Sequence, residues 1–320
     1  MSDRKWVRLA ALAALILACA MPALADTRIE RELTLQPGGK FILDTDNGSV
    51  RVVGGSGSRA RVVITSSRDD IESLYDIKFE ERPGEVEVNV DRKGVKKWFN
   101  WGNSGKMKFE IEVPDSTEID IDTSGGSIVV EAIDAPARLD TSGGSINASN
   151  IRGDLLADTS GGAITIEEVD GNVNADTSGG GINVHGVRGN VRADTSGGGI
   201  TIGDVTGDIA ADTSGGSIRI EGAGGQVQAE SSGGPVLVSF ASGNSAGGSL
   251  STSGGGITVT LDGSANLDID AASSGGSVDI DVPVTVQGRV SRTAVKGTLG
   301  SGGELLKLRT SGGGIKIRSR

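Results

Sequence analysis

Six aspartates recur along the chain at intervals of eighteen residues, and each begins the pentapeptide Asp-Thr-Ser-Gly-Gly. They are Asp122, Asp140, Asp158, Asp176, Asp194 and Asp212. If each eighteen-residue unit stacks on the one before it, neighbouring carboxylates lie about 4.8 Å apart, the spacing of hydrogen-bonded strands. Carboxylates at that separation repel each other, and a bound Ca²⁺ would relieve the repulsion. A calcium ladder running from Asp140 to Asp212 is therefore one hypothesis for this column.

A simpler interpretation of the same aspartates is favoured. The calcium-binding nonapeptide pattern Gly-Gly-x-Gly-x-Asp is absent from the sequence. An aspartate beside a tight turn also accepts backbone N–H bonds without any metal. We therefore predict that each motif aspartate caps the turn that follows it, and that the protein uses no metal and no cofactor.

A polysaccharide-active β-helix enzyme is the alternative function. Retaining glycosidases hold two carboxyl groups about 5 Å apart, which is close to the spacing expected here. A uniform row, however, distinguishes no acid from a nucleophile, and no groove of aromatic residues accompanies it. His185 is the only histidine, and its equivalents in the other repeats are glutamate, serine and glycine. We expect it to be exposed and to belong to no catalytic triad or histidine metal site, and we predict no catalytic residue.

One segment departs from the repeat pattern and combines cations with aromatic rings. Residues 91–106 read DRKGVKKWFNWGNSGK. The binding residues that this segment suggests are Lys96, Lys97, Trp98, Phe99 and Trp101. Between two expected strands, the segment could form a protruding hairpin tip that binds an envelope glycan, an anionic surface or a surface protein. The alternative is a structural role, in which the rings fold back and cover the open end of the fold.

The elements that position these residues follow from the same period. With each motif aspartate counted as position 0, positions 6 and 8 are apolar in all six repeats, and position 7 is mostly polar. This alternation is typical of a strand with one buried face. A second alternating segment carries the motif, and its threonine has the parity of the inward side chains. Glycine at position 13, from Gly153 onward, suggests a turn that needs a positive φ.

Eighteen residues thus contain two short strands and two turns, which make one coil of a flattened parallel β-solenoid. The sequence predicts an all-β protein with a signal peptide over residues 1–25, an N-terminal β-rich cap over 26–118 and a β-solenoid (β-helix) of about 18-residue coils over 119–320. The last motif copy, at residues 310–313, precedes a charged segment. We expect that segment at the terminal edge of the solenoid, where charge discourages further strand pairing.

The chain resembles a bacterial β-strand-repeat family of adhesin-like proteins, domain of unknown function 4097. The resemblance rests on residues 108–114, which lead into the first motif, on the iterated Thr-Ser-Gly-Gly-x-Ile units, and on residues 296–303 before the final Thr-Ser-Gly-Gly-Gly-Ile. It covers most of the chain after the signal peptide. The resemblance implies an exported or membrane-attached repeat protein, and it brings no catalytic residues with it.

Residues 1–25 have the features of a secretory signal peptide: a basic start, an apolar stretch from Leu9 to Ala20 and a small-residue cleavage site before Asp26. A lipoprotein site at Cys19, the only cysteine, is less favoured because Leu17 is large. Removal of residues 1–25 leaves 28 basic and 41 acidic residues, a net charge of −13. We therefore expect no disulfide in the mature chain and no transmembrane segment after signal cleavage.

The negative charge disfavours nucleic acid and anionic lipid as partners. Together, these features predict an exported, non-enzymatic β-solenoid, periplasmic or at the cell surface, that serves as an adhesin-like or scaffold binding surface in the bacterial cell envelope. An envelope glycan or a surface protein is the expected partner. The sequence leaves the ligand and the oligomeric state open.

Overall fold

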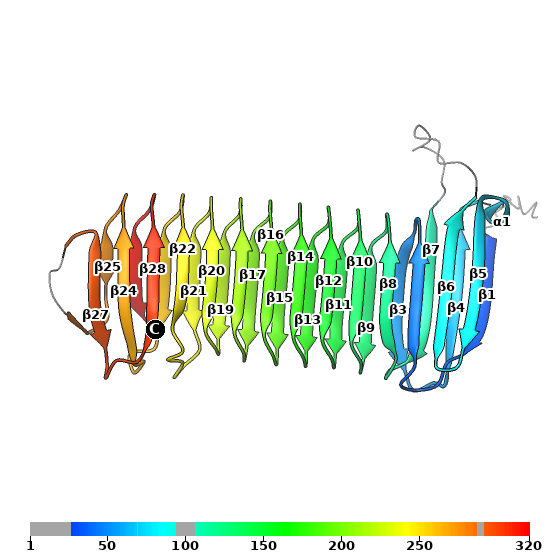
Figure 1. Cartoon of the computed structure of the whole chain (residues 1–320), viewed down its shortest axis with the longest axis horizontal. Helices are drawn as coiled ribbons and strands as arrows, with labels where there is room; N and C mark the ends of the chain where they lie inside the picture. The colour runs from blue at the N-terminus through cyan, green and yellow to red at the C-terminus, as the bar shows by residue number, and fades with distance from the viewer. Residues whose placement is uncertain (1–26, 69, 94–105, 287–290) are drawn as a thin grey trace, which may run out of the picture.

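The computed structural model describes residues 27–68, 70–93, 106–286 and 291–320. Over these residues the chain forms an elongated stack of strands, arranged in two long sheets (Figure 1). The only helix in the described part is the single turn α1 (Ile71–Leu74). The signal peptide and Cys19 lie outside the described residues.

In the described residues one sheet, here called sheet A, contains fourteen strands, and the other, sheet B, contains fifteen. Sheet A consists, in spatial order, of β1 (Thr27–Thr34), β4 (Arg59–Ser66), β7 (Met107–Pro114), β3 (Ser49–Gly55), β9 (Ile128–Ile133), β11 (Ile146–Ile151), β13 (Ile164–Val169), β15 (Ile182–Val187), β17 (Ile200–Val205), β19 (Ile218–Ala223), β21 (Val236–Phe240), β23 (Ile257–Leu261), β29 (Ile315–Ser319) and β25 (Val278–Ile280). Sheet B consists of β26 (Val284–Val286), β27 (Ala294–Leu299), β24 (Leu267–Ser273), β28 (Glu304–Thr310), β22 (Gly248–Thr252), β20 (Val227–Ser231), β18 (Ile209–Thr213), β16 (Val191–Thr195), β14 (Val173–Thr177), β12 (Leu155–Thr159), β10 (Ala137–Thr141), β8 (Glu118–Thr123), β2 (Lys40–Thr45), β6 (Glu85–Arg92) and β5 (Tyr75–Arg82).

The middle of the molecule is a regular solenoid. From β8 to β21 each repeat contributes one strand to sheet B and the next strand to sheet A. Equivalent strands pair in parallel and in register, so that Asp140 lies opposite Asp158 and Ile146 lies opposite Ile164. The prediction of an all-β, parallel β-solenoid with about 18-residue coils is confirmed. Both sheets also continue from β8 and β9 into β2 and β3.

The alternation of side chains builds the core between the two sheets. Ile164 and Ile166, at positions 6 and 8, are fully buried, whereas Thr165 between them is partly exposed on the outer face. The motif threonine also points inward, as its parity predicts: Thr159 is only 1% exposed. Small and β-branched side chains therefore fill the narrow space between the sheets.

The inward threonine closes each corner of the coil. The hydroxyl of Thr159 donates to the carbonyl oxygen of Gly144 in the preceding coil, with 2.8 Å between the oxygens. The same hydroxyl accepts the N–H of Gly162, three residues later, at 3.3 Å. The motif threonines from Thr141 to Thr213 repeat this pair of bonds. A buried hydroxyl is thus satisfied while it connects successive coils.

Glycine is required at the corners because backbones of successive coils approach closely. A Cβ atom on Gly162, at position 4, would lie 1.9 Å from the carbonyl oxygen of Gly144, and one on Gly171, at position 13, would lie 2.3 Å from that of Gly153. The prediction of a positive φ at position 13 is wrong. The left-handed residue is at position 10, where Asn150 and Glu168 both have φ of 56°. Position 13 therefore selects glycine for space and not for its dihedral angle.

At both ends of the stack, the order of the coils differs from their order in the chain. Near the N-terminal end, the coil β2–β3 lies between β6–β7 and β8–β9. Near the other end, the last coil, β28–β29, lies between β22–β23 and β24–β25. The prediction that the last motif copy forms the terminal edge is therefore wrong. The coil β28–β29 pairs on both sides because the preceding coil β24–β25 stands one place further out.

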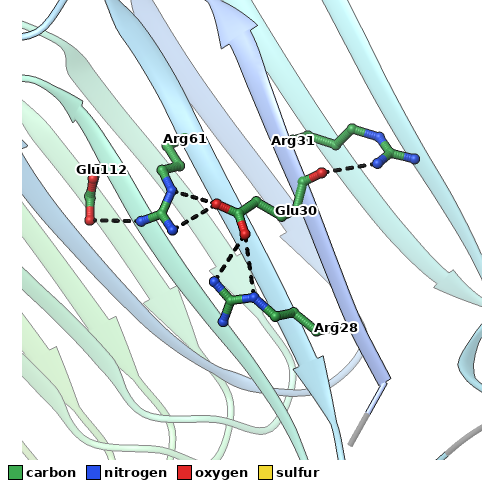
Figure 2. A network of polar contacts seen from close by, with 5 residues as sticks. All are labelled: Arg28, Glu30, Arg31, Arg61 and Glu112. Atoms are coloured by element: carbon green, nitrogen blue, oxygen red, sulfur yellow. Dashed lines mark hydrogen bonds and ion pairs between the residues drawn. The ribbon is translucent and has the colours of Figure 1, made fainter.

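The N-terminal end of sheet A is an antiparallel group of β1, β4 and β7, joined by charged side chains (Figure 2). The carboxylate of Glu30 accepts hydrogen bonds from Arg61 at 2.8 Å and from Arg28 at 3.1 Å, and Arg61 also reaches Glu112 at 3.1 Å. The hydrogen bond from Arg61 is the main reason that the pKa of Glu30 is lowered. A charged edge strand of this kind discourages pairing with other chains.

Candidate functional site: the carboxylate column of sheet B

The motif aspartates form a straight line on the outer face of sheet B. Parallel pairing places each aspartate beside its copy in the next coil. The same pairing adds Asp44 beside Asp122 at one end of the line and Glu230 beside Asp212 at the other. We call this line the carboxylate column: Asp44, Asp122, Asp140, Asp158, Asp176, Asp194, Asp212 and Glu230. Asp44 was not predicted to belong to the column, although Asp44-Thr45 repeats the first two residues of the motif.

Burial and mutual repulsion both act on the column. Partial burial is the main cause that raises the pKa of Asp122, Asp140, Asp158 and Asp194, and the neighbouring carboxylates raise these pKa values further. Burial also raises the pKa of Asp44, and the carboxylates of Asp91, Asp46 and Glu87, which are not members of the column, raise it further. The stacked fold therefore holds these carboxyl groups in an environment that disfavours their charge.

Two arginines partly compensate this charge. Arg192 Nε lies 2.9 Å from Asp194 Oδ2, in the same strand. Arg138 lies 3.6 Å from Asp140 and 3.9 Å from Asp120, so it bridges more loosely. Because two arginines face six motif aspartates, the middle of the carboxylate column stays negative.

The aspartates of the motif do not cap the corners, so this prediction is wrong. In the regular coils, the N–H of the motif serine donates to the threonine carbonyl of the preceding coil, and the N–H of the second glycine donates to the threonine hydroxyl of its own coil. The reason is side-chain parity: position 0 points outward from sheet B, whereas position 1 points into the corner. The aspartates therefore remain available on the surface.

Turn capping by side-chain oxygens occurs instead at position 14, on the opposite edge. The N–H of Asn172 donates to Asp154 Oδ1 at 2.8 Å, that of Asn190 to Asn172 Oδ1 at 3.1 Å, and that of Asp208 to Asn190 Oδ1 at 2.8 Å. This ladder joins successive coils in the manner of stacked amides. The repeated Asp or Asn at this position was the signal in the sequence that could have revealed it.

A shallow groove of about 640 Å³ runs along sheet B beside the carboxylate column. We call it the Leu156 groove. Its walls and floor include Pro136, Arg138, Leu155, Leu156, Asn174 and Arg192. Arg138 and Arg192 stand three coils apart in the same outward column, with Leu156 and Asn174 between them. The groove thus offers an apolar floor between two cations, with the carboxylate column along one side.

The remaining candidate residues fall into two groups. His185 is exposed, as predicted, and its Nε2 lies 3.4 Å from Oδ2 of the exposed Asp204. Among the described residues, no cluster of three or more His, Cys, Asp or Glu side chains has the arrangement of a metal site. Calcium binding by the column, the less favoured of the two hypotheses, stays untested.

The segment with Lys96, Lys97, Trp98, Phe99 and Trp101 lies outside the described residues. Its flanking strands are placed: β6 belongs to sheet B and β7 to sheet A. These two strands pair with β2 and β3 and belong to opposite sheets, so they do not form the two arms of a hairpin. The binding role of the segment stays a prediction.

No helix in the described part of the chain is both long enough and apolar enough to cross a membrane.

Residues 39–318 match the family model described as Toastrack DUF4097. No curated protein matches the chain.

Three solved structures are similar to this chain over most of their length. A "putative cell adhesion protein" from Clostridium sporogenes is 15% identical with a TM-score of 0.27, and the match covers 92% of this chain and 100% of that one. A "putative adhesin" from Bacteroides fragilis is 14% identical with a TM-score of 0.36, covering 93% and 99%. A "putative lipid binding protein" from Parabacteroides distasonis is 12% identical with a TM-score of 0.43, covering 92% and 96%.

Proposed function

The chain belongs to the Toastrack DUF4097 family, and we propose that it is an exported, non-enzymatic scaffold whose sheet B binds a component of the bacterial cell envelope. The observation that carries this proposal is the outer face of sheet B. Eight coils present one carboxylate each in a straight line, from Asp44 to Glu230. The Leu156 groove lies beside the middle of that line.

A face of this kind suits a partner that is itself extended and repetitive. The coils repeat at about 4.8 Å, the strand spacing, and the parallel ladders hold the side chains in place before any ligand arrives, which lowers the entropic cost of binding. A partner that contacts several successive coils gains affinity from many weak contacts. The negative charge favours a neutral or cationic partner, such as an envelope glycan or a basic surface protein.

Catalysis on the same face is the alternative, and the column argues against it. A glycosidase needs two carboxyl groups whose environments push their pKa values apart. Asp140 and Asp158 share the same environment, and their pKa values are raised by the same causes in the same order. An assay for new reducing ends on isolated envelope polysaccharide tests this alternative, and release of sugar by the protein would favour it.

The binding proposal is tested by co-sedimentation with isolated envelope fractions. The test variant is Asp140→Asn, Asp158→Asn and Asp176→Asn, which keeps the shape of three coils and removes their charge. The matched control is Asn147→Ala, Thr165→Ala and Asn183→Ala, on the outer face of sheet A in the same three coils. We expect the wild type and the control to sediment with the envelope and the test variant to stay in solution.

Equal sedimentation of all three proteins, or of none, would contradict the assignment to sheet B. A further variant, Trp98→Ala with Trp101→Ala, separates the two proposed binding regions. Loss of binding in that variant, with the asparagine variant unaffected, would place the contact at the aromatic segment instead. Circular dichroism of every variant checks that the solenoid is intact.

A further inference from the structure

The last coil of the chain, residues 304–320, occupies a slot between two coils that precede it in the sequence. We call it the C-terminal coil. Strand β28 pairs in parallel with β22 on one side and with β24 on the other, and β29 pairs likewise with β23 and β25. The two flanking coils are joined to each other by residues 262–266, which pass over the C-terminal coil. Both coils that bound the slot therefore precede the C-terminal coil in the sequence.

The C-terminal coil repeats the corner bonds of the regular coils on both of its sides. Thr310 Oγ1 donates to the carbonyl oxygen of Gly255 at 2.7 Å. Ser273 Oγ, in the next coil out, donates to the carbonyl oxygen of Gly313 at 2.7 Å. Its inward side chains, including Leu306, Leu308 and Ile315, are fully buried. The slot thus recognises a strand, a Thr-Ser-Gly-Gly corner and a second strand, which many coils of this chain would supply.

Charge distinguishes the C-terminal coil from the others. At the outward position where the regular coils have an aspartate, it has Arg309. Arg309 lies 2.9 Å from Asp270 of the outer flanking coil, and Lys316 lies opposite Asp279 of the same coil. Burial acts to raise the pKa of Asp270. The hydrogen bonds from Arg309 and Lys296 act in the opposite direction and outweigh burial, so the pKa of Asp270 is lowered overall. A regular coil in the slot would place its aspartate near Asp270, so the slot is selective for the basic coil.

The connection to the C-terminal coil is a turn of four residues that crosses over a strand. Strands β27 and β28 lie on either side of β24, so residues 300–303 must cross over that strand. The crossing spans two strand spacings, about 9.6 Å. Gly300 and Gly302 have φ of 61° and 78°, and Asn266 Oδ1 holds the turn by accepting bonds from Ser301 N–H at 2.8 Å and Ser301 Oγ at 2.9 Å.

We propose that the slot also receives the C-terminal coil of a second copy of this chain, so that two chains exchange these coils. Exchange of an element is a low-cost route to a dimer, because the exchanged element makes the same contacts in either arrangement. In the exchanged form, residues 300–303 extend away from β24 instead of folding back over it. The exchange links solenoids through their C-terminal ends, and it does not depend on which face of the solenoid binds the envelope.

A cross-linking experiment tests the exchange in the full chain with Cys19→Ser. Ser249 and Lys307 are paired neighbours on β22 and β28, and both side chains are on the outer face. One chain carries Ser249→Cys and a second carries Lys307→Cys; the two are unfolded, mixed, refolded and treated with a short bismaleimide. We expect a dimer on a denaturing gel that contains the 249–307 link, identified by mass spectrometry. The double variant in one chain should show the same link within the monomer.

The control pair is Ser249→Cys with Lys316→Cys, because Lys316 belongs to the same coil but to the opposite sheet. A dimer yield no higher than that of the control pair would overturn the proposal. Light scattering of the refolded wild-type chain gives an independent reading, since exchange shifts the mass to that of a dimer and a purely monomeric mass would contradict it. Asn266→Ala removes the bonds that hold the turn and should raise the dimer fraction.

Discussion

The regular middle of the solenoid and its C-terminal end are built from the same corner motif, but they are assembled differently. In the middle, from β8 to β21, each coil after the first stacks on the coil that precedes it in the chain. At the end, the coil β24–β25 leaves a place that residues 304–320 fill later. The motif therefore makes coils able to stack, and it does not decide which coil becomes the neighbour.

Charge differs between the same two regions. The middle repeats like charges along the carboxylate column, and the pKa values of Asp140 and Asp158 are raised by burial and by their neighbours. The end pairs opposite charges, with Arg309 2.9 Å and Lys296 3.2 Å from Asp270. The middle thus tolerates repulsion because its backbone ladders set the register, whereas the end uses attraction to select one coil.

The largest expected effect is from a Cβ atom in a corner of the middle. Gly162→Ala would place a Cβ 1.9 Å from a backbone oxygen of the neighbouring coil. The coils must separate there, and we expect a loss of about 4 kcal/mol or more, in the range of severe core substitutions. Thermal unfolding followed by circular dichroism measures the effect.

The adjacent glycine is the control for that substitution. A Cβ on Gly161 would be 3.6 Å from its nearest neighbour, which is ordinary contact. Gly161→Ala should therefore leave the melting temperature close to that of the wild type. If both variants melt alike, close backbone packing is not what requires glycine at position 4.

Removal of a buried side chain from the C-terminal coil should have the next largest effect, and it should stay local. Leu308 is fully buried, and Leu308→Ala should cost about 2–5 kcal/mol. Because coils in a solenoid contact only their neighbours, the loss of stability should be confined to the C-terminal end, which then unfolds while the middle stays folded. Hydrogen exchange should show faster exchange in β24, β25, β28 and β29, and unchanged protection from β10 to β19. Faster exchange throughout the chain would show that the two regions unfold together.

A smaller effect is expected from the corner hydroxyls. Thr177→Val keeps the shape of the side chain and leaves the carbonyl of Gly162 and the N–H of Gly180 without the hydroxyl. Buried groups left unsatisfied cost about 1–3 kcal/mol. Ser273→Ala makes the equivalent change in the end region, where Ser273 bonds Gly313 and Gly276. The first variant should lower the melting temperature of the middle, and the second only that of the end.

The smallest expected effect is an opposite response of the two regions to acid. Asp122, Asp140, Asp158 and Asp194 have pKa values above the ordinary 3.8 when folded. The folded middle therefore binds protons more readily than the unfolded chain, and its stability rises as the pH falls through the raised pKa values towards 3.8.

At the C-terminal end the sign is reversed. The pKa of Asp262 is lowered from 3.8 to about 2, mainly by the hydroxyl of Ser242, and the pKa of Asp270 is also lowered. Their contribution is present above pH 3.8 and is lost as the pH falls through the lowered values. Hydrogen exchange at pH 6 and at pH 4, expressed as protection relative to the intrinsic exchange rate at each pH, should show greater protection of the middle at the lower pH. The triple asparagine variant of the column should lose that change, and an unchanged response would contradict this account.

Much of the fold follows from the period alone, as particular residues illustrate. The alternation around Ile164 and Ile166 predicts a strand and its buried face, and the parity of Thr159 places it inward before any contact is known. The candidate site was predicted in part: the aspartates do form an outward column, but their role as turn caps was wrong, because an outward side chain cannot reach the corner that Thr159 occupies.

The sequence by itself determined the eighteen-residue coil, the inner and outer columns and the negative outer face, because each follows from which side chains alternate along one strand. Only the tertiary structure decided that residues 304–320 lie inside the stack, that position 10 is left-handed and that glycine at position 13 serves close packing. The physical reason is that these features depend on how coils pack against one another, and not on the alternation within one strand. The place of residues 304–320 depends on contacts between segments distant in the chain, such as Arg309 with Asp270.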